Sequence, residues 1–301
     1  MSRRDEDAGF AAVLQQIDRT VDFETSHYDD SYLGRRIAAR MRRRDTDSHD
    51  DYAALLQSET DEREALRDTL TINTTSFFRN PEMWEALRPI LRDVTDDGSA
   101  RVWSAPCADG REAYSISMLA HDDPELRPRR LSVVGTDIDE RALDAARAGS
   151  YETTRTTDIG DELSVLDDPD AVVERHEETF TVRDSVRRPV EFETHDLVRD
   201  GPRSGFDVVL CRNLLIYLSQ PLQEHVFRLF RYALKEEGFL FLGPSEAIGP
   251  SQSFFAVADK NQSILQAKPL GPDEDRLGPL SSPPNMSPAD PSPQARTRAP
   301  T

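Results

Sequence analysis

The sequence predicts an α/β protein, in which a helical N-terminal segment precedes a parallel sheet flanked by helices. Two observations support this prediction. Over about the first ninety residues, apolar side chains recur mainly at helical spacing. From Arg101 onward, short apolar runs alternate with helix-forming segments, an order typical of βαβ units and parallel sheets.

The segment from Arg101 to Met118, RVWSAPCADGREAYSISM, is the centre of the predicted sheet. Val102 and Trp103 form a buried strand, residues 104–110 a tight loop and residues 111–120 a helix. Ligands bind at the carboxyl ends of strands in open α/β sheets, and small loop residues let backbone N–H groups approach them. The loop is therefore a candidate site for a nucleotide-type cofactor. Because the GxGxxG spacing is absent, an ordinary turn is the alternative.

The composition limits the possible classes of function. The net charge of −19 over 301 residues excludes a nucleic-acid-binding protein that works through its overall charge. No segment approaches the ~20 apolar residues of a membrane span. Two cysteines are too few for a disulfide framework or a zinc cluster, so we expect no metal site and a cytoplasmic location. Only three of the 37 basic residues are lysine, and an acidic, lysine-poor chain is typical of a salty cytoplasm.

One helix of the N-terminal segment is predicted to be strongly basic. No acid occurs between Asp30 and Asp45, although the chain is acidic almost everywhere else. A solvated helix face is one interpretation, and the contrast favours the other, a docking surface for an acidic partner. Its residues would be Arg35, Arg36, Arg40, Arg42 and Arg43.

Apolar side chains at helical spacing predict the helices of the N-terminal segment, with a break near Ser58. These sets are Phe10, Val13, Leu14 and Ile17; Leu33, Ile37 and Met41; and Leu55, Leu56, Leu66 and Leu70.

A connector, TINTTSFFRN, joins the helical segment to the predicted sheet. It is too rich in β-branched and polar residues to be a good helix. Asn80 and Pro81 then predict a helix start, with a cap followed by the first helical position. The connector therefore carries Asn73, Thr75 and Arg79 at the junction of two domains.

Acidic residues follow the second predicted strand, residues 131–135. Asp139 can cap the helix that follows, and Gly149 can end it. Asp137 then stands at the end of the strand, where a carboxylate can accept hydrogen bonds from ribose hydroxyls. A capping or turn aspartate is the alternative.

The rest of the chain predicts a small β appendage and further strands. Residues 150–195 contain the strand-like TFTVR and PVEFET, separated by a turn at Asp184, Ser185 and Val186. His195, Asp196 and Leu197 follow a strand end, and FDVVLCRN is a strand with a polar exit. A helix QEHVFRLFRYALKEEG, a strand from Gly238 and a last strand at residues 263–267 complete the sheet. Residues 269–301 hold nine of the twenty prolines and predict disorder.

An ordered set of motifs resembles the CheR family of chemotaxis receptor methyltransferases, which methylate glutamate side chains of methyl-accepting chemotaxis proteins. The resemblance covers roughly residues 10–268. It depends on YLGRRIAARMRRR, NTTSFFRN, VWSAPCADGREAYSIS, GTDIDERALDAARAGSY, FDVVLCRNLLIYLSQP and GFLFLGPSE, all in the family's order.

The resemblance implies a class I S-adenosylmethionine-dependent methyltransferase fold. It has a Rossmann-like, mostly parallel seven-stranded sheet, an N-terminal all-α domain and a small antiparallel β appendage. Residues 1–92 would be the docking domain and linker, residues 93–268 the cofactor-binding domain and residues 269–301 the tail. The implied partner is the cytoplasmic helical bundle of a receptor, bound by a monomer that neither binds nucleic acid nor inserts into the membrane.

The resemblance also assigns site residues. S-adenosylmethionine would be bound by Asn73, Thr75, Arg79, Glu112, Asp137, Asp196, Leu197, Asn213 and Leu214, with Arg79 and Tyr217 as catalytic residues. Tyr217 has an alternative role as a core aromatic. Three positions depart from the family's usual pattern: Arg111 replaces the first acid of a Glu-Glu pair, Ala113 replaces a proline and Asp196 replaces an asparagine. A carboxylate can accept a hydrogen bond from the adenine amine but cannot donate one.

Two other functions remain open from the sequence: a methyltransferase with another substrate, and an inactive scaffold that senses the cofactor. Some family members grip a tethering peptide at the receptor's C-terminus through a glycine-containing appendage loop. This chain has no glycine between Glu174 and Phe192. We therefore expect recognition of the receptor bundle without a tether.

Overall fold

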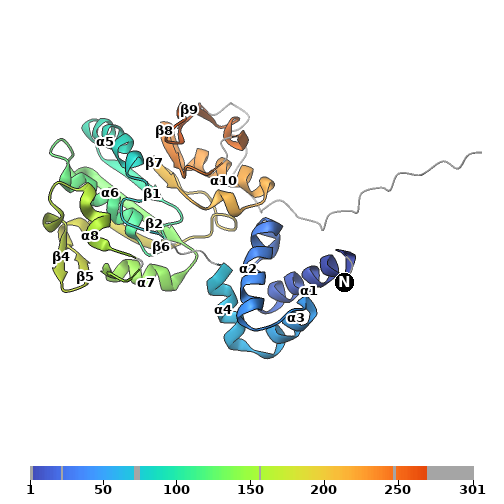
Figure 1. The fold of residues 1–301 in the computed structure, drawn as a ribbon. Helices are drawn as coiled ribbons and strands as arrows, with labels where there is room; N and C mark the ends of the chain where they lie inside the picture. Colours follow the sequence, from blue (N-terminus) through green and yellow to red (C-terminus); the bar gives the residue numbers. More distant parts are fainter. Residues whose placement is uncertain (1–2, 22, 71–74, 156, 247–248, 270–301) are drawn as a thin grey trace, which may run out of the picture.

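The computed structural model describes residues 3–21, 23–70, 75–155, 157–246 and 249–269, as a helical N-terminal domain and a larger α/β domain (Figure 1). The predicted residues Asn73 and 270–301 lie outside this part of the chain. No described helix is long and apolar enough to cross a membrane. The N-terminal helices are α1 (Arg3–Thr20), α2 (Asp30–Arg43), α3 (His49–Ser58) and α4 (Thr60–Leu70). The predicted apolar sets meet in one core, which includes Val13, Ile17, Leu33, Ile37, Leu56 and Leu66.

A buried carboxylate organises this helical domain. Glu62 is 1% exposed, and its two oxygens accept from Arg40 Nε at 3.0 Å and Nη2 at 2.6 Å. The hydroxyl of Tyr52 donates to the same carboxylate at 2.8 Å. Arg40 is thus engaged inside the domain, because a buried charge requires a partner. We therefore remove it from the predicted docking surface.

The larger domain is built on a seven-stranded sheet in the order β6-β2-β1-β7-β8-β10-β9. The first five strands of this order are parallel and β10 is antiparallel, which confirms the mostly parallel sheet. Side chains alternate between its faces: Val102 and Val133 lie in one core, Trp103 and Val134 in the other. The strands are β1 (Ala100–Ser104), β2 (Leu131–Asp137), β6 (Val190–Thr194), β7 (Phe206–Cys211), β8 (Leu234–Leu242), β9 (Phe255–Asp259) and β10 (Ile264–Ala267).

Helices cover both faces of this sheet (Figure 1). Buried residues of α5 and α6 belong to the core of Val102, and those of α10 to the core of Trp103. Asp139 caps α7 by accepting from Arg141 N at 3.0 Å, and Gly149 ends it at φ 60°, as predicted. These helices are α5 (Pro81–Asp96), α6 (Arg111–Asp122), α7 (Glu140–Ala148) and α10 (Gln220–Ala233).

A three-stranded antiparallel sheet forms the appendage, in the order β3-β5-β4. Its hairpin joins β4 to β5 through Glu177 and Glu178. The predicted turn at Asp184–Val186 is wrong, because these residues begin a short helix that returns the chain to the main sheet, where PVEFET pairs with β2 as β6. The appendage elements are β3 (Ser150–Glu152), α8 (Ile159–Glu162), β4 (Val173–His176), β5 (Thr179–Val182) and α9 (Asp184–Arg187).

Two other local predictions are corrected by tertiary contacts. The predicted helix through Lys235–Glu237 ends at Ala233, because Leu234 pairs with Phe206 of β7 and strand pairing overrides helix propensity. Asn80 precedes Pro81 as predicted, but its side chain does not cap α5, because it accepts from Arg212 instead. The sequence analysis also missed β9, which pairs antiparallel with β10.

Candidate cofactor site

The polar residues that follow β6, β2, β1 and β7 lie at one edge of the sheet, because these strands are parallel neighbours. Asp137 ends β2, and Asp196 follows β6. Glu112 lies in the first turn of α6 after the β1 loop, and Asn213 follows β7. The structure therefore brings four of the predicted cofactor-binding residues to this edge.

The loop after β1 depends on a glycine. Gly110 has a φ of 86°, and a Cβ there would lie 2.7 Å from Ala146 Cβ and 2.8 Å from Phe192 Cζ. A side chain at this position is therefore strained and has no room. The backbone N–H of Cys107 donates to Thr136 O at 2.8 Å, which ties the loop to β2.

Asp137 holds two backbone N–H groups at the end of β2. Its Oδ2 accepts from Ala108 N at 2.8 Å and its Oδ1 from Asp139 N at 3.0 Å. The side chain is 6% exposed, and this burial raises the pKa of Asp137 above its usual value. Asp137 therefore also stabilises the turn, as the alternative interpretation predicts, while Asp139 caps α7. Each carboxylate oxygen keeps a second acceptor position for a ligand.

Two cavities at this edge of the sheet share Ile138 and Asp196, and Asp137 lines the smaller of them. The smaller, about 70 Å³, is lined by Tyr28, Pro106, Thr136, Asp137, Ile138, His195, Asp196, Leu197, Val198, Leu214 and Leu218. The larger, about 480 Å³, is lined by Arg67, Ile138, Asp139, Glu140, Arg141, Thr194, Asp196, Arg199 and Asp200.

The lining of these cavities fits an adenosyl group. Ile138 is 51% exposed, an apolar surface on which a base can pack. His195 also lines the smaller cavity, is 6% exposed, and has no hydrogen-bond partner for its Nε2 within the described protein. Asp196 uses Oδ1 to accept from Val198 N at 2.8 Å, so its carboxylate also shapes its own turn.

Glu112 forms a buried ion pair that the sequence analysis missed. Its Oε1 accepts from Ser104 Oγ at 2.8 Å and its Oε2 from Arg212 Nη1 at 3.1 Å. Arg212 Nη2 also donates to Arg79 O at 2.8 Å and to Asn80 Oδ1 at 2.6 Å. The only sequence signal was an arginine directly before Asn213 in an otherwise apolar strand exit. Arg212 therefore links the connector to the first turn of α6.

A second missed residue, Glu246, shapes the loop after β7. Its Oε1 accepts from Leu214 N at 3.0 Å and from Leu215 N at 2.8 Å, and its Oε2 accepts from Gly243 N. Burial raises the pKa of this carboxyl group. Asn213 adopts a φ of 61° in the loop. The glutamate of the GFLFLGPSE motif thus holds the backbone at Leu214, a predicted cofactor-binding residue, and at the neighbouring Leu215.

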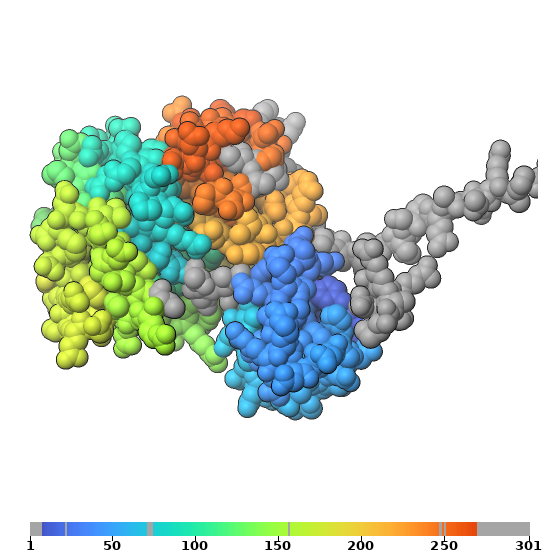
Figure 2. Space-filling view, viewed as in Figure 1, coloured from blue at the N-terminus to red at the C-terminus, as the bar shows by residue number. Residues whose placement is uncertain are grey.

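The N-terminal domain closes one side of the site. Tyr28 lines the smaller cavity and forms a backbone bridge with Leu218. Asp29 N donates to Tyr217 O at 2.9 Å, and Ser219 N donates to His27 O at 3.1 Å. The Tyr217 ring lies 4.7 Å from the ring of Tyr32, a contact typical of the core alternative. Figure 2 shows the two domains in contact.

The connector follows α4, and its described residues begin at Thr75. Thr75 and Arg79 are half-buried within it. Trp84 Nε1 donates to Arg79 O at 3.0 Å, so Arg79 is held through its backbone from both Trp84 and Arg212. One predicted residue of the connector, Arg79, is therefore placed by its backbone beside the Glu112 and Arg212 pair.

Comparisons with known proteins agree with both domains. The family model of the CheR methyltransferase all-alpha domain matches residues 8–71, and that of the CheR methyltransferase SAM binding domain matches residues 73–264. A chemotaxis protein methyltransferase of Salmonella typhimurium is 31% identical over 254 residues, 80% of this chain and 84% of that protein. One of Listeria monocytogenes is 35% identical over 182 residues, 60% of this chain and 67% of that protein.

A third relative is longer. An uncharacterized 104.1 kDa protein of Rhodobacter capsulatus is 34% identical over 251 residues. The match takes in 80% of this chain and 25% of that protein, so the chain spans about a quarter of this relative's length.

Proposed function

Since this chain belongs to the CheR family of methyltransferases, we propose that it transfers methyl groups from S-adenosylmethionine to glutamate side chains of chemotaxis receptors in the cytoplasm. The observation that carries this proposal is the pair of family domains in their usual order, joined by a connector that meets the polar edge of the sheet. Transfer of labelled methyl groups to a receptor's cytoplasmic fragment tests it.

In this proposal, different residues at the edge of the sheet bind different parts of the cofactor. Asp137 accepts from the ribose hydroxyls, Glu112 from the amino group, and Asp196 with Leu197 flanks the adenine. Asn213 and Leu214 close the pocket, and Thr75 and Arg79 reach it from the connector. The buried acceptor positions of Asp137 and the exposed apolar surface of Ile138 support this arrangement.

The chemistry needs little help from a base. Bound S-adenosylmethionine supplies an electrophilic methyl group on a positively charged sulfur. A glutamate carboxylate, with a pKa of ~4.3, is already ionised at neutral pH, so it can attack without losing a proton in the site. Arg79 orients a carboxylate through two parallel hydrogen bonds, and Tyr28 and Tyr217 help to exclude water.

Replacing Asp137 by alanine should weaken S-adenosylmethionine binding by ~1–3 kcal/mol, the usual contribution of hydrogen bonds to a charged group. Titration calorimetry measures this change. Asp144→Ala is the matched control, because it removes an exposed carboxylate of α7 that pairs with Arg147 and lines neither cavity. If Asp137→Ala keeps the affinity of the control, Asp137 serves only the turn.

The exposed arginines of α2 should govern affinity for the receptor and not for the cofactor. With Arg40 engaged by Glu62, the proposed docking surface consists of the exposed Arg35, Arg42 and Arg43 and the half-buried Arg36. The double reversal Arg42→Glu with Arg43→Glu should raise the KM for an acidic receptor fragment several-fold at low salt, by losing exposed pairs of ~0.2–1 kcal/mol each.

The matched control for this surface lies on the other domain. Arg127→Glu with Arg129→Glu reverses two exposed charges there and should leave the KM unchanged. Added salt should reduce the difference between the two double variants, because exposed charges are screened. An equal KM for both variants at low salt would refute the docking role of α2.

Receptor recognition should not require a C-terminal tether. The β4–β5 loop consists of Glu177 and Glu178, and the chain has no glycine there that could open a peptide groove. Removing a receptor's C-terminal tail, with its helical bundle intact, should leave the methylation rate unchanged. A sharp fall in the rate on this truncation would show that the appendage grips the tail.

A further inference from the structure

The connector beside the cofactor site has an unusual backbone. Phe78 has a φ of 46° and Asn80 a φ of 60°, and both lie in the left-handed region that residues other than glycine rarely adopt. Such conformations persist only where the surrounding structure holds them, and they gather at functional sites. Arg79 lies between these two residues.

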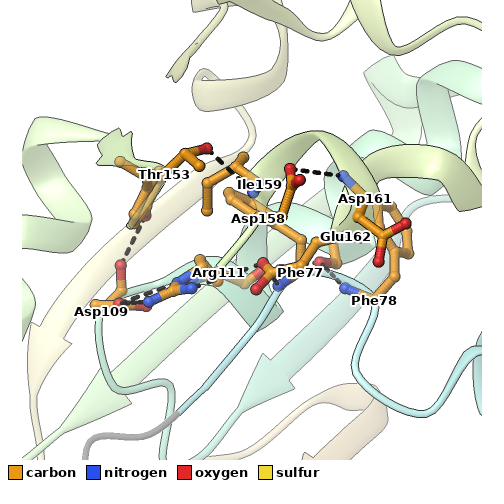
Figure 3. A network of polar contacts seen from close by, with 11 residues as sticks. Phe77, Phe78, Asp109, Arg111, Thr153, Asp158, Ile159, Asp161 and Glu162 are labelled. Atoms are coloured by element: carbon orange, nitrogen blue, oxygen red, sulfur yellow. Dashed lines mark hydrogen bonds and ion pairs between the residues drawn. The ribbon is translucent and has the colours of Figure 1, made fainter. Parts of the chain in front are cut away.

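Hydrogen bonds from three helices and from Arg212 hold this backbone. Phe78 N donates to Ser115 Oγ of α6 at 3.1 Å, and Arg79 O accepts from Trp84 of α5 and from Arg212. The remaining contact comes from the appendage: Phe77 N donates to Glu162 Oε2 at 2.9 Å (Figure 3). One carboxylate of α8 thus fixes the start of the segment that carries Arg79.

Arg111 holds that carboxylate. Its Nη1 lies 3.6 Å from the same Glu162 oxygen, and both side chains are largely buried. Arg111 Nη2 also donates to Asp109 Oδ2 at 2.8 Å (Figure 3). The Arg111 guanidinium lies 5.5 Å from the centre of the Tyr151 ring. The Tyr151 hydroxyl donates to Asp109 O at 2.7 Å. The loop after β1, the appendage and the connector therefore meet at Arg111.

We propose that Arg111 and Glu162 are positioning residues for methyl transfer, which fix Phe77 and through it the place of Arg79 at the cofactor. This inference rests on the proposed role of Arg79 in the site. The family's usual acid at position 111 would repel both Glu162 and Asp109, so this chain uses its departure from the family pattern to build the contact. The appendage thereby supports the cofactor site directly.

Three variants and one control test the pair. Glu162→Ala should weaken S-adenosylmethionine binding about tenfold and raise hydrogen exchange at the Phe77 and Phe78 amides by a similar factor, because the acceptor is lost. Glu162→Gln keeps an acceptor for Phe77 N and should restore most of both properties. Arg111→Gln should fall between them. Glu174→Ala, which removes an exposed appendage carboxylate paired with Arg183, is the control and should match the unmodified protein.

Titration calorimetry with S-adenosylmethionine and amide hydrogen exchange test this inference without a receptor. Binding and exchange in Glu162→Ala within twofold of Glu174→Ala would overturn it, as would a Glu162→Gln protein no better than Glu162→Ala. If the unmodified protein methylates no receptor fragment while these differences in binding appear, the proposed substrate is wrong and the positioning role stands.

Discussion

Replacing Arg79 by alanine should abolish methyl transfer and leave the free energy of unfolding nearly unchanged. Arg79 lies on a connector and in none of the three hydrophobic cores, and its backbone contacts with Trp84 and Arg212 do not need its side chain. Single-turnover transfer to a receptor fragment measures the activity, and thermal unfolding measures the stability.

Arg79→Lys is the informative companion of this variant. Lysine keeps the positive charge but cannot form the planar pair of hydrogen bonds that guanidinium makes with a carboxylate. We expect partial activity from Arg79→Lys and none from Arg79→Ala. Near-normal turnover in Arg79→Ala would remove Arg79 from the site.

Replacing Glu112 by alanine should cost about 3 kcal/mol of unfolding free energy, because it leaves the buried charge of Arg212 without its carboxylate. The Arg212 side chain is 3% exposed, and among the described residues only Arg79 O and Asn80 Oδ1 would continue to accept hydrogen bonds from it. Chemical denaturation measures this loss. Binding of S-adenosylmethionine should be lost as well.

Glu112→Gln separates the two roles of this residue. The amide oxygen can still accept one hydrogen bond, so we expect a smaller loss of stability, while the loss of charge should weaken binding of the cofactor's ammonium group. Equal denaturation midpoints for Glu112→Ala and the unmodified protein would contradict the structural role of the pair. Unchanged cofactor binding in Glu112→Gln would contradict its binding role.

The order of helices and strands was predictable because it follows from the local spacing of apolar residues along the sequence. Val13, Ile17, Leu33 and Ile37 recur at helical spacing and do form the N-terminal core. The convergence of Asp137 and Asp196 was predictable because neighbouring parallel strands end at one edge. These predictions need no knowledge of which distant residues meet.

Long-range partners could not be predicted from the same signals. Arg40 is equivalent to its neighbours on a helical wheel, yet it binds Glu62 on another helix. Asn80 is a residue type that often caps helices and it precedes α5, yet its side chain accepts a hydrogen bond from Arg212 instead. Arg111 looked only like a departure from a family pattern until Glu162 of the appendage was placed beside it. Each outcome is set by a partner that the tertiary fold supplies.

The central claim is tested most directly by incubating the protein with labelled S-adenosylmethionine and cytoplasmic fragments of chemotaxis receptors. The account predicts label on receptor glutamates that mild alkali releases, as it does from a methyl ester, and none with Arg79→Ala. Cofactor binding without transfer to any fragment, or label that survives alkali, would contradict it.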